Sequence, residues 1–408
     1  MQLAKKADRP NVGILGGSIT GCAVAAELAR AGCGVTVLER GGEEPKDRGA
    51  GIGLPPSLVE TLVEHDLIDA DVPHLDVHTF RHLVRDEREE RYGLVLWEQP
   101  GNIAHFNWGA LYRNLRRRVP EGAYHTGCKV TGLRESDHGT VAVTLAEGRT
   151  REFDLLVCAD GYRSLGRRTL FPDSPVSYAR YVLWRGAVEE RLLSEVKSLE
   201  GTLCWPSYVG GHGPFFLVPG LDGSIAPGRR LVNWGLYLGV YEDERAELLT
   251  GSDPAAYDGP MPAAREAKLK AWVPEVLPEY FAEIVDKSSA THVQKVHEST
   301  VPAYRKGRIC LAGDAGALAR PHTGTGVLKG ITDAIGLADA LKTHPRLDDA
   351  LTHWSDERTA HGNELVRLAS QIGRALAAEI PGGPKADPAA KQKQFSSMVT
   401  VPSEVFAS

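Results

Sequence analysis

The sequence has few of the features that mark a membrane-spanning, metal-binding or disulfide-rich protein. It contains no run of about 18 consecutive apolar residues, and glycines interrupt the apolar stretch near the N-terminus that loosely resembles a signal peptide. Its six cysteines are scattered and form no Cys-x-x-Cys pair, which argues against a zinc site and a disulfide framework. We therefore expect a cytoplasmic protein with no resident metal and no place in a membrane.

Charge and length narrow the class further. The formal net charge is −6, so the chain lacks the basic excess of a general nucleic-acid binder or of a protein that lies on anionic membranes. With 408 residues, 42% apolar and 25% charged, it has an ordinary globular composition and is long enough for two domains. We expect a monomer or homodimer that acts on a small molecule.

The first informative motif is a glycine-rich turn near the N-terminus. It has the pattern Gly-x-Ser-x-x-Gly from Gly16 to Gly21, and such a turn lets the backbone approach a pyrophosphate. Glu39 ends the next strand, where a carboxylate would hold ribose hydroxyls, while Arg40 beside it could contact phosphate or adenine. A plain strand-to-helix turn remains the alternative. The predicted elements are a strand over 11–15, a helix over 22–31 and a strand over 34–39.

A second motif, Asp160-Gly161, follows an apolar strand in the middle of the chain. The pair predicts a tight turn, with the basic residues Arg163 and Arg167 close by. Asp160 could equally cap a helix that begins near Ser164.

The third motif combines a strand end with a helix start. A buried strand over 309–312 ends at Gly313-Asp314, a loop rich in Gly, Pro and Thr follows, and a helix begins near Gly326. A carboxylate at the strand end can hold a sugar hydroxyl, and the helix start aims bare N–H groups and a positive dipole end at a developing anion. A tight turn without further function remains possible here too.

Apolar periodicity predicts most of the remaining elements. An aromatic-rich sheet is expected between residues 182 and 241, and a helix over 268–285 should be broken by Pro274 and Pro278. The other expected elements are helices over 56–65, 111–119 and 354–380, two short strands within 79–100, and strands over 129–133, 141–145 and 151–157.

The three motifs, in this order, resemble the FAD-dependent aromatic hydroxylases, the group of flavoprotein monooxygenases that includes p-hydroxybenzoate hydroxylase. Longer segments resemble the 2,6-dihydroxypyridine 3-hydroxylase-like enzymes within that group, and the resemblance spans roughly residues 10–370. Those segments are 16–21, 48–52, 181–186, 218–220 with 233–234, and 320–323.

The resemblance implies an α/β fold, with a Rossmann-like FAD-binding domain of the p-hydroxybenzoate hydroxylase type and an interleaved substrate domain built on a mixed β-sheet. The implied FAD-binding domain is discontinuous and covers 1–78, 101–173 and 285–370. The substrate domain covers 79–100 and 174–284, and residues 371–408 form a helix end and a tail.

The resemblance also implies the chemistry. FAD would be the cofactor and NADH or NADPH and O2 the co-substrates. An electron-rich aromatic or heteroaromatic ring would be hydroxylated or epoxidised through a hydroperoxide at flavin C4a. The residues implied to bind FAD are Gly16, Ser18, Ile19, Thr20, Gly21, Glu39, Arg40, Arg48, Gly49, Val130, Asp160, Gly313, Asp314, Pro321, Gly324, Thr325, Gly326 and Val327.

Substrates of such enzymes are activated by losing a phenolic proton, so a general base or relay is expected. The candidates are His212, His322, His297 and Tyr237, with Pro321 giving the loop a fixed backbone beside the flavin ring. Candidates for the substrate pocket are Trp184, Arg185, Trp205, His212, Phe216 and Tyr237. Aromatic residues in a sheet are more often core, and Arg185 could form an ion pair at a domain seam rather than meet an anionic substrate.

The chain departs from the broader group at Trp108, where many members carry an arginine that contacts FAD, and at Ala317, where a histidine is frequent.

Other enzyme readings are a flavin-dependent halogenase, whose Trp-x-Trp-x-Ile-Pro segment is missing, and an isoprenoid reductase. A non-catalytic FAD-fold binding or escort protein is the third alternative, although such a protein needs no loop around the flavin ring. Neither the substrate nor the choice between NADH and NADPH follows from the sequence.

Overall fold

The structure, a computed structural model, describes residues 9–43, 51–136, 139–239, 259–260, 263–289 and 291–374. Arg48 and Gly49, both predicted to bind FAD, and the predicted 381–408 tail lie outside these residues. None of the helices in the described ranges is long and apolar enough to cross a membrane.

A mostly parallel sheet forms the centre of one part of the molecule, and we call it the parallel sheet. Its inner strands are short, apolar and mostly buried, as expected where helices or other layers cover both faces, whereas the two edge strands are polar and partly exposed. In spatial order they are β18 (Arg305–Lys306), β19 (Ile309–Leu311), β10 (Leu155–Cys158), β1 (Asn11–Leu15), β2 (Gly34–Leu38) and β6 (Tyr124–His125).

The three predicted motifs lie side by side at one edge of the parallel sheet. They follow β1, β10 and β19, which are adjacent parallel strands although their sequences are far apart. Because parallel strands end at the same edge, the three turns converge there, which is where open α/β sheets bind ligands. This convergence positions the candidate site.

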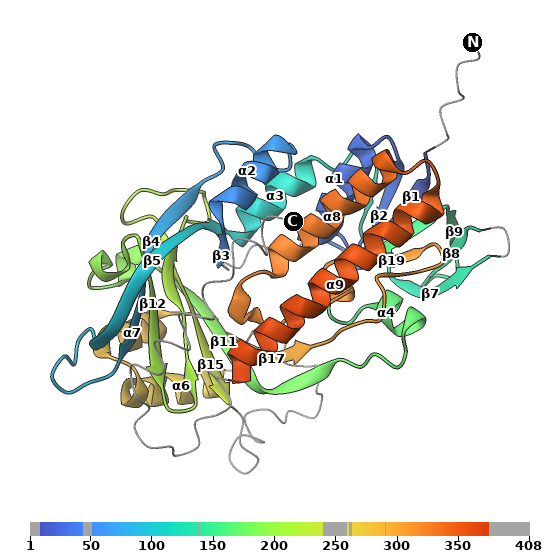
Figure 1. Cartoon of the computed structure of the whole chain (residues 1–408). Helices are drawn as coiled ribbons and strands as arrows, with labels where there is room; N and C mark the ends of the chain where they lie inside the picture. The colour runs from blue at the N-terminus through green and yellow to red at the C-terminus, as the bar shows by residue number, and fades with distance from the viewer. Residues whose placement is uncertain are drawn as a thin grey trace.

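Helices cover this sheet on the side that faces the viewer in Figure 1, where α8 and α9 run next to each other. Helix α1 packs against both α3 and α8. A small antiparallel sheet packs near β1, with Phe153 against Gly13. The elements are α1 (Ile19–Arg30), α2 (Pro56–Glu64), α3 (Trp108–Arg117), α4 (Leu165–Leu170), α8 (Gly326–Thr343), α9 (Leu347–Gly373), β7 (Val130–Glu135), β8 (Val141–Leu145) and β9 (Thr150–Phe153).

A large mixed sheet forms the other part of the molecule (Figure 1). Strands β4 and β12 pair in parallel and the other pairs are antiparallel, while α6 (Ala263–Val276) and α7 (Glu279–Lys287) close one face over a hydrophobic cluster. In spatial order the strands are β16 (Gly259–Pro260), β17 (His292–Glu298), β11 (Ser177–Glu189), β15 (Leu231–Gly239), β13 (Gly211–His212), β12 (Thr202–Tyr208), β4 (His74–Val84), β5 (Leu94–Asn107) and β3 (Gly51–Leu54), with β14 (Phe215–Val218) beside β12 and β15.

The fold class implied by the resemblance is confirmed, whereas several element boundaries were predicted wrongly. The strands expected within 79–100 are longer, because β4 and β5 form one extended ribbon. Pro274 lies inside the last turn of α6, where its missing N–H removes the bond to one carbonyl four residues earlier without ending the helix. Only Pro278 separates two helices. Helix α9 begins at Leu347 rather than at residue 354, with acidic residues in its first turn that suit a helix N-terminus. The domain boundaries stay a prediction.

Candidate active site

Gly16 turns the chain sharply where β1 ends. Its φ angle is +90°, its N–H donates to the Leu38 carbonyl at 3.0 Å, and a Cβ added here would lie 2.5 Å from the Ala159 carbonyl oxygen. Any side chain is therefore strained at this position. Ser18 precedes α1 and makes no side-chain capping bond, so the first N–H groups of the helix need an acceptor from outside it, such as a phosphate.

The first turn of α1 contains Ile19, Thr20 and Gly21, because the helix begins earlier than predicted. Thr20 lies between the Gly313 turn and helix α8. A Cβ added to Gly313 would lie 2.7 Å from Thr20 Oγ1, and one added to Gly330 would lie 2.1 Å from it. The two glycines thus let the first motif, the third motif and α8 approach closely.

Glu39 is fixed by the backbone around the first turn. Its Oε2 accepts from the Gly17 N–H and its Oε1 from the Gly41 N–H, both at 2.8 Å. Each carboxylate oxygen has a further lone pair, so the group can still accept a bond from a ribose hydroxyl. Arg40 next to it is exposed.

Asp160 caps the short helix that follows it, as the alternative for the second motif predicted. Its Oδ2 accepts from the Leu165 N–H at 2.6 Å, and Ser164 Oγ accepts from the Arg167 N–H at 3.0 Å. The other carboxylate oxygen, Oδ1, is buried and has no hydrogen-bond partner among the described residues. Asp160 therefore has one oxygen that bonds the fold and one that meets no donor from the described part of the chain.

Arg167 ties the second motif to the third. Its guanidinium, on a side chain that is 1% exposed, donates to the Asp314 carbonyl at 2.8 Å, to the Ala315 carbonyl at 3.3 Å and to the Tyr162 carbonyl. Three backbone acceptors on one buried cation hold the two turns in fixed relative positions. The sequence shows this residue only as a basic neighbour of Asp160.

A buried group of charges anchors the third motif to α8 and α9. Asp333 Oδ2 accepts from the Gly313 N–H at 2.9 Å, and Oδ1 accepts from Arg358 Nε at 2.8 Å. Lys329 Nζ lies 3.7 Å from Asp333 Oδ2 and is 1% exposed. Burial raises the pKa of Asp314, and the Lys329 and Arg167 charges oppose that rise. The geometry of the Gly313-Asp314 turn thus depends on charges behind it.

The loop from Pro321 to Gly326 presents open backbone to the space above it. Gly324 has a φ angle of +65°, and a Cβ added to Gly324 or Gly326 would meet nothing within 4 Å. Thr325 precedes α8 and makes no side-chain capping bond to the helix; its hydroxyl lies 2.6 Å from that of Thr323. The positive end of α8 therefore faces this space and suits an anion or a ring that gains negative charge.

These residues fit FAD. The Gly16 turn offers helix N–H groups to a pyrophosphate, and Glu39 offers a carboxylate to the ribose. The Gly313-Asp314 turn lies on the neighbouring strand end, and the bare loop after it leads to a cavity wide enough for a ring system.

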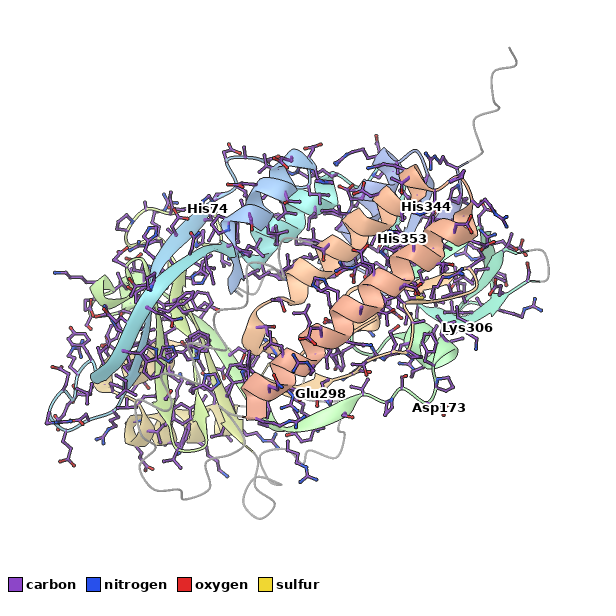
Figure 2. All side chains as sticks on the ribbon, viewed as in Figure 1. His74, Asp173, Glu298, Lys306, His344 and His353 are labelled. Carbon is purple, nitrogen blue, oxygen red and sulfur yellow. The ribbon has the colours of Figure 1, made fainter. Side chains whose placement is uncertain are left out.

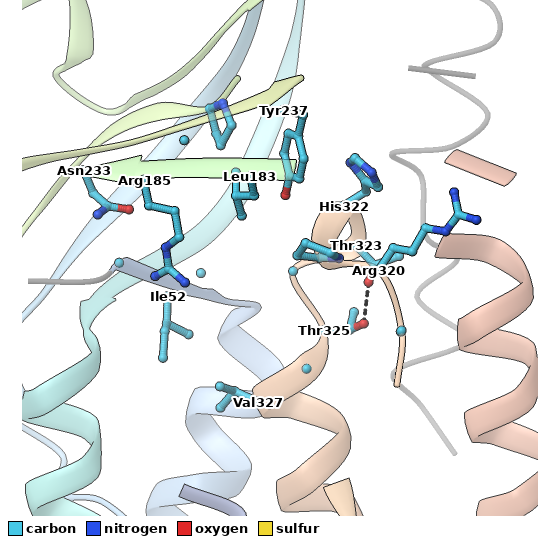
Figure 3. A pocket seen from close by; sticks show the side chains of 18 of the residues that line it. Ile52, Leu183, Arg185, Asn233, Tyr237, Arg320, His322, Thr323, Thr325 and Val327 are labelled. Atoms are coloured by element: carbon cyan, nitrogen blue, oxygen red, sulfur yellow. Dashed lines mark hydrogen bonds between the residues drawn. The ribbon is translucent and has the colours of Figure 1, made fainter. Parts of the chain in front are cut away.

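A cavity of about 670 Å³ lies between this loop and the mixed sheet, within the usual range for small-molecule sites. Figure 3 shows Arg185, Leu183 and Tyr237 extending from the sheet on one side, with Ile52 and Val327 on the opposite side. The predicted site residues that line it are Asp314, Pro321, Gly324, Thr325, Gly326, Val327, His322, His297, Tyr237, Arg185, Trp205 and Phe216. Trp108 lines it as well and stacks on Tyr112 at 5.2 Å.

His322 is the titratable group of the loop that reaches the cavity. Its Nε2 lies 2.6 Å from the Tyr181 hydroxyl, and its Nδ1 is buried without a hydrogen-bond partner in the described part of the chain. Burial, helped by the Arg320 charge, lowers the pKa of His322 to about 3. The ring is therefore neutral at neutral pH, and its Nδ1 is the nitrogen that no described residue bonds. Its neighbour Arg320 pairs with Glu298, which lies beside α9 (Figure 2).

The structure does not bring every predicted residue to the cavity. His212 lies behind Tyr237, with ring centroids 4.8 Å apart, and accepts a bond from Trp205 Nε1 at 2.6 Å. Trp184 is buried in the hydrophobic cluster under α6 and α7. Val130 packs against the hydrophobic core around the parallel sheet. No group of three or more His, Cys, Asp or Glu side chains that could hold a metal occurs in the described ranges.

Three buried histidines make the stability of the fold depend on pH. Burial lowers the pKa of His82, His105 and His322 to about 3, below the ordinary value of about 6.5. The unfolded chain therefore binds more protons than the folded chain below about pH 6.5, so stability falls as pH falls. Between pH 7.0 and 5.5 we expect a loss of about 1.2 kcal/mol for each histidine, or about 4 kcal/mol in all, measured by urea unfolding.

The matched variant is His82→Phe, which keeps an aromatic ring between Trp97 and Trp205. It should lose about 1.2 kcal/mol less than the parent over that pH range. His78→Gln, at an exposed position, should leave the pH dependence unchanged. An equal pH dependence in all three proteins would contradict the assignment.

A family model decides the identity. The model described as "FAD binding domain" matches residues 9–192 and 250–369, and one described as "FAD binding domain-like" matches residues 178–298. The chain belongs to the FAD binding domain family. Its cofactor is FAD, and the chain is an FAD-dependent monooxygenase that uses NAD(P)H and O2, as the resemblance implied.

Curated relatives and solved structures agree with this family. The chain is 27% identical to the 2,6-dihydroxypyridine 3-monooxygenase of Paenarthrobacter nicotinovorans over 91% of this chain and 94% of that protein. It is 27% identical to a 3-amino-4-hydroxybenzoate 2-monooxygenase of Streptomyces platensis over 92% and 90%. The structure of 2,6-dihydroxypyridine-3-hydroxylase from Arthrobacter nicotinovorans superposes with a TM-score of 0.80 at 22% identity, covering 93% and 95%. These similarities support the monooxygenase reading and not the halogenase, reductase or escort alternatives.

Proposed function

We propose that this member of the FAD binding domain family hydroxylates a small aromatic or heteroaromatic ring, and that His322 accepts a hydrogen bond from a ring hydroxyl group. The observation that carries the proposal is the pairing of His322 with Tyr181 on the wall of the cavity. The neutral imidazole has one nitrogen held by the tyrosine hydroxyl and one that no described residue uses. A hydroxyl group of a bound ring would complete this arrangement.

Tyr181 decides which way the imidazole faces. Burial raises the pKa of the Tyr181 hydroxyl above its ordinary value, so the hydroxyl stays protonated and can either donate to Nε2 or accept from it. When a substrate hydroxyl donates to Nδ1, the Nε2–H donates to the Tyr181 oxygen. Hydrogen bonding at the ring oxygen moves electron density into the ring, which favours oxygen transfer to a ring carbon.

We further propose that FAD lies extended along the strand ends, with the domain boundaries predicted from the sequence. Bound there, FAD would take two electrons from NADH or NADPH and activate O2. The protein's part is to hold the cofactor and the substrate and to keep water away from them. The residues proposed to hold FAD are Gly16, Ser18, Ile19, Thr20, Gly21, Glu39, Arg40, Arg48, Gly49, Val130, Asp160, Gly313, Asp314, Pro321, Gly324, Thr325, Gly326 and Val327.

Replacing His322 by leucine should lower the rate of product formation by about 10-fold to 100-fold, the range for a lost hydrogen bond to a group that gains charge. NAD(P)H oxidation should continue and release hydrogen peroxide, because the cofactor side of the cavity is unchanged. Tyr181→Phe should lower the ratio of product formed to NAD(P)H consumed by a smaller factor. The measurement is product by chromatography against NAD(P)H consumed, with a panel of hydroxylated rings.

The control is His78→Gln, an exposed position far from the loop in sequence, which should match the parent. If His322→Leu and Tyr181→Phe both keep the parent's ratio of product to NAD(P)H, His322 has no role at the hydroxyl. If the purified parent contains no FAD, or no ring stimulates NAD(P)H oxidation, the proposed function itself fails.

A further inference from the structure

Arg185 places a positive charge on the cavity wall that no acidic side chain among the described residues pairs with. It extends from β11 into the cavity (Figure 3), and its partner on the neighbouring strand is Gly235. Arg320, another cation of the wall, is held by Glu298 at 2.7 and 2.8 Å. Arg185 has no such partner in the described ranges.

The surroundings of Arg185 make an unpaired charge unfavourable. Phe80, Leu203 and Phe216 belong to the apolar cluster that forms part of the same wall. Burial lowers the pKa of Arg185, yet a guanidinium stays protonated in proteins. Arg185 is only partly exposed, and a charge drawn out of water normally needs a partner that neutralises it. Asp314 is the one carboxylate among the described lining residues, and it belongs to the turn that ends β19. The missing negative charge is therefore expected on the ligand.

The strand register places one cross-strand pair, Leu183 and Tyr237, between Arg185 and His322. Leu183 lies opposite Tyr237 on the neighbouring strand, and the Tyr237 ring lies 4.3 Å from the His322 ring, centroid to centroid. Arg185 is two residues further along β11, a step of about 6–7 Å. The cation and the imidazole therefore lie on the two sides of the Leu183–Tyr237 pair (Figure 3).

We propose that the substrate is a monoanion with a single ring, whose ionised oxygen group binds the Arg185 guanidinium while a separate hydroxyl group of the ring binds His322. This inference rests on the proposed function and names the substrate class of the same site. The ionised oxygen can belong to a carboxylate or to the ring itself as an enolate, since a planar guanidinium binds both. In either case the ligand supplies the charge that the wall lacks.

The test is a binding titration of the purified FAD-bound enzyme without NAD(P)H, followed by the change in flavin absorbance. The probes are 4-hydroxybenzoate for a carboxylate, 2,6-dihydroxypyridine for a ring enolate, and 4-hydroxybenzamide as the neutral match of the first. At least one anion should bind about 10-fold to 100-fold more tightly than the neutral probe, the range for a hydrogen bond to a charged group. Which anion binds identifies the source of the charge.

Arg185→Met keeps the length of the side chain and removes its charge, so it should abolish the preference for the anion and leave the affinity for the amide unchanged. Arg185→Lys should retain part of the preference. Arg191→Met is the control, because that arginine is exposed and pairs with Glu189 outside the cavity. Flavin content and melting temperature of each variant verify that it folds. Equal binding of anion and amide by the parent, or a preference that survives in Arg185→Met, would overturn the proposal.

Two measurements separate this inference from the proposed function. Anaerobic reduction of bound FAD by NADH or NADPH, and product formation from any phenol, test the monooxygenase activity alone. If neutral phenols are hydroxylated without any preference for anions, the substrate class is wrong and the activity stands. If anions bind through Arg185 but no ring is hydroxylated, the proposed function is wrong and the anion site stands. A shift of the flavin midpoint potential in Arg185→Met, without a change in anion affinity, would assign Arg185 to the flavin instead.

Discussion

Gly16→Ala is expected to yield a protein that purifies without FAD. The added Cβ would lie 2.5 Å from the Ala159 carbonyl oxygen, at a position with a φ angle of +90°. The backbone can relieve this contact only by moving the turn away from β10, which displaces the N-terminus of α1 and the Glu39 contact at Gly17. We expect the affinity for FAD to fall by about 10²-fold or more, corresponding to about 3 kcal/mol, measured by fluorescence titration of the apoprotein.

Gly122→Ala is the matched control. Gly122 also has a positive φ angle, +75°, but a Cβ added there meets nothing within 4 Å. The Gly122→Ala variant therefore measures the cost of the backbone conformation alone, about 1 kcal/mol in the free energy of unfolding. This variant should keep its FAD. If Gly16→Ala binds FAD as tightly as Gly122→Ala does, the close approach at Ala159 has no role in the cofactor site.

The second large effect is expected from Asp333→Asn. Asp333 accepts hydrogen bonds from Gly313 and Arg358 and lies 3.7 Å from Lys329 Nζ, and the asparagine would leave two buried cations with no carboxylate at this position. Breaking a buried ion pair by removing one partner costs about 3–5 kcal/mol. We expect a loss of this size in the free energy of unfolding, measured by urea denaturation with FAD present at a fixed concentration.

Asp339→Asn, on the same helix, is the comparison. Asp339 pairs with Lys342 at 3.0 Å with both side chains largely exposed, so the substitution should cost no more than about 1 kcal/mol. A similar small loss in Asp333→Asn would mean that Asp314 or solvent compensates the Lys329 and Arg358 charges.

The cofactor half of the site was predictable from the sequence because its signals are local. A strand end followed by glycines and a helix start can be read within about twenty residues. Three such turns converge because parallel strands end at one edge. What the sequence does not show is the set of contacts between the turns. Arg167 reads as one basic residue among several, and its role depends on the neighbouring positions of β10 and β19.

The substrate half depends on which face of β11 each residue occupies. Tyr181, Leu183 and Arg185 alternate with Trp184, so the tryptophan lies in the core and the other three face the cavity or its His322 wall. Applying the two-residue period of a strand to residues 181–185 would have placed Trp184 and Arg185 on opposite faces. It would also have placed Tyr181 on the same face as Arg185. Helices α6 and α7 pack on the face of β11 that carries Trp184, so the opposite face lines the cavity. The residues around β11 do not show which face the helices will cover.

The position of Arg167 between the second and third motifs has a consequence for the order of events during synthesis. Strand β19 and the start of α8 come late in the chain, after β1, β2 and β10 are complete. A ribosome-bound chain can therefore form the first turn and the Glu39 contact long before residues 309–326 emerge. Only when β19 inserts between β10 and β18 do the carbonyls at Asp314 and Ala315 reach Arg167. Stable retention of FAD is then a late event, and nascent chains truncated before residue 309 should release the cofactor that full-length chains keep.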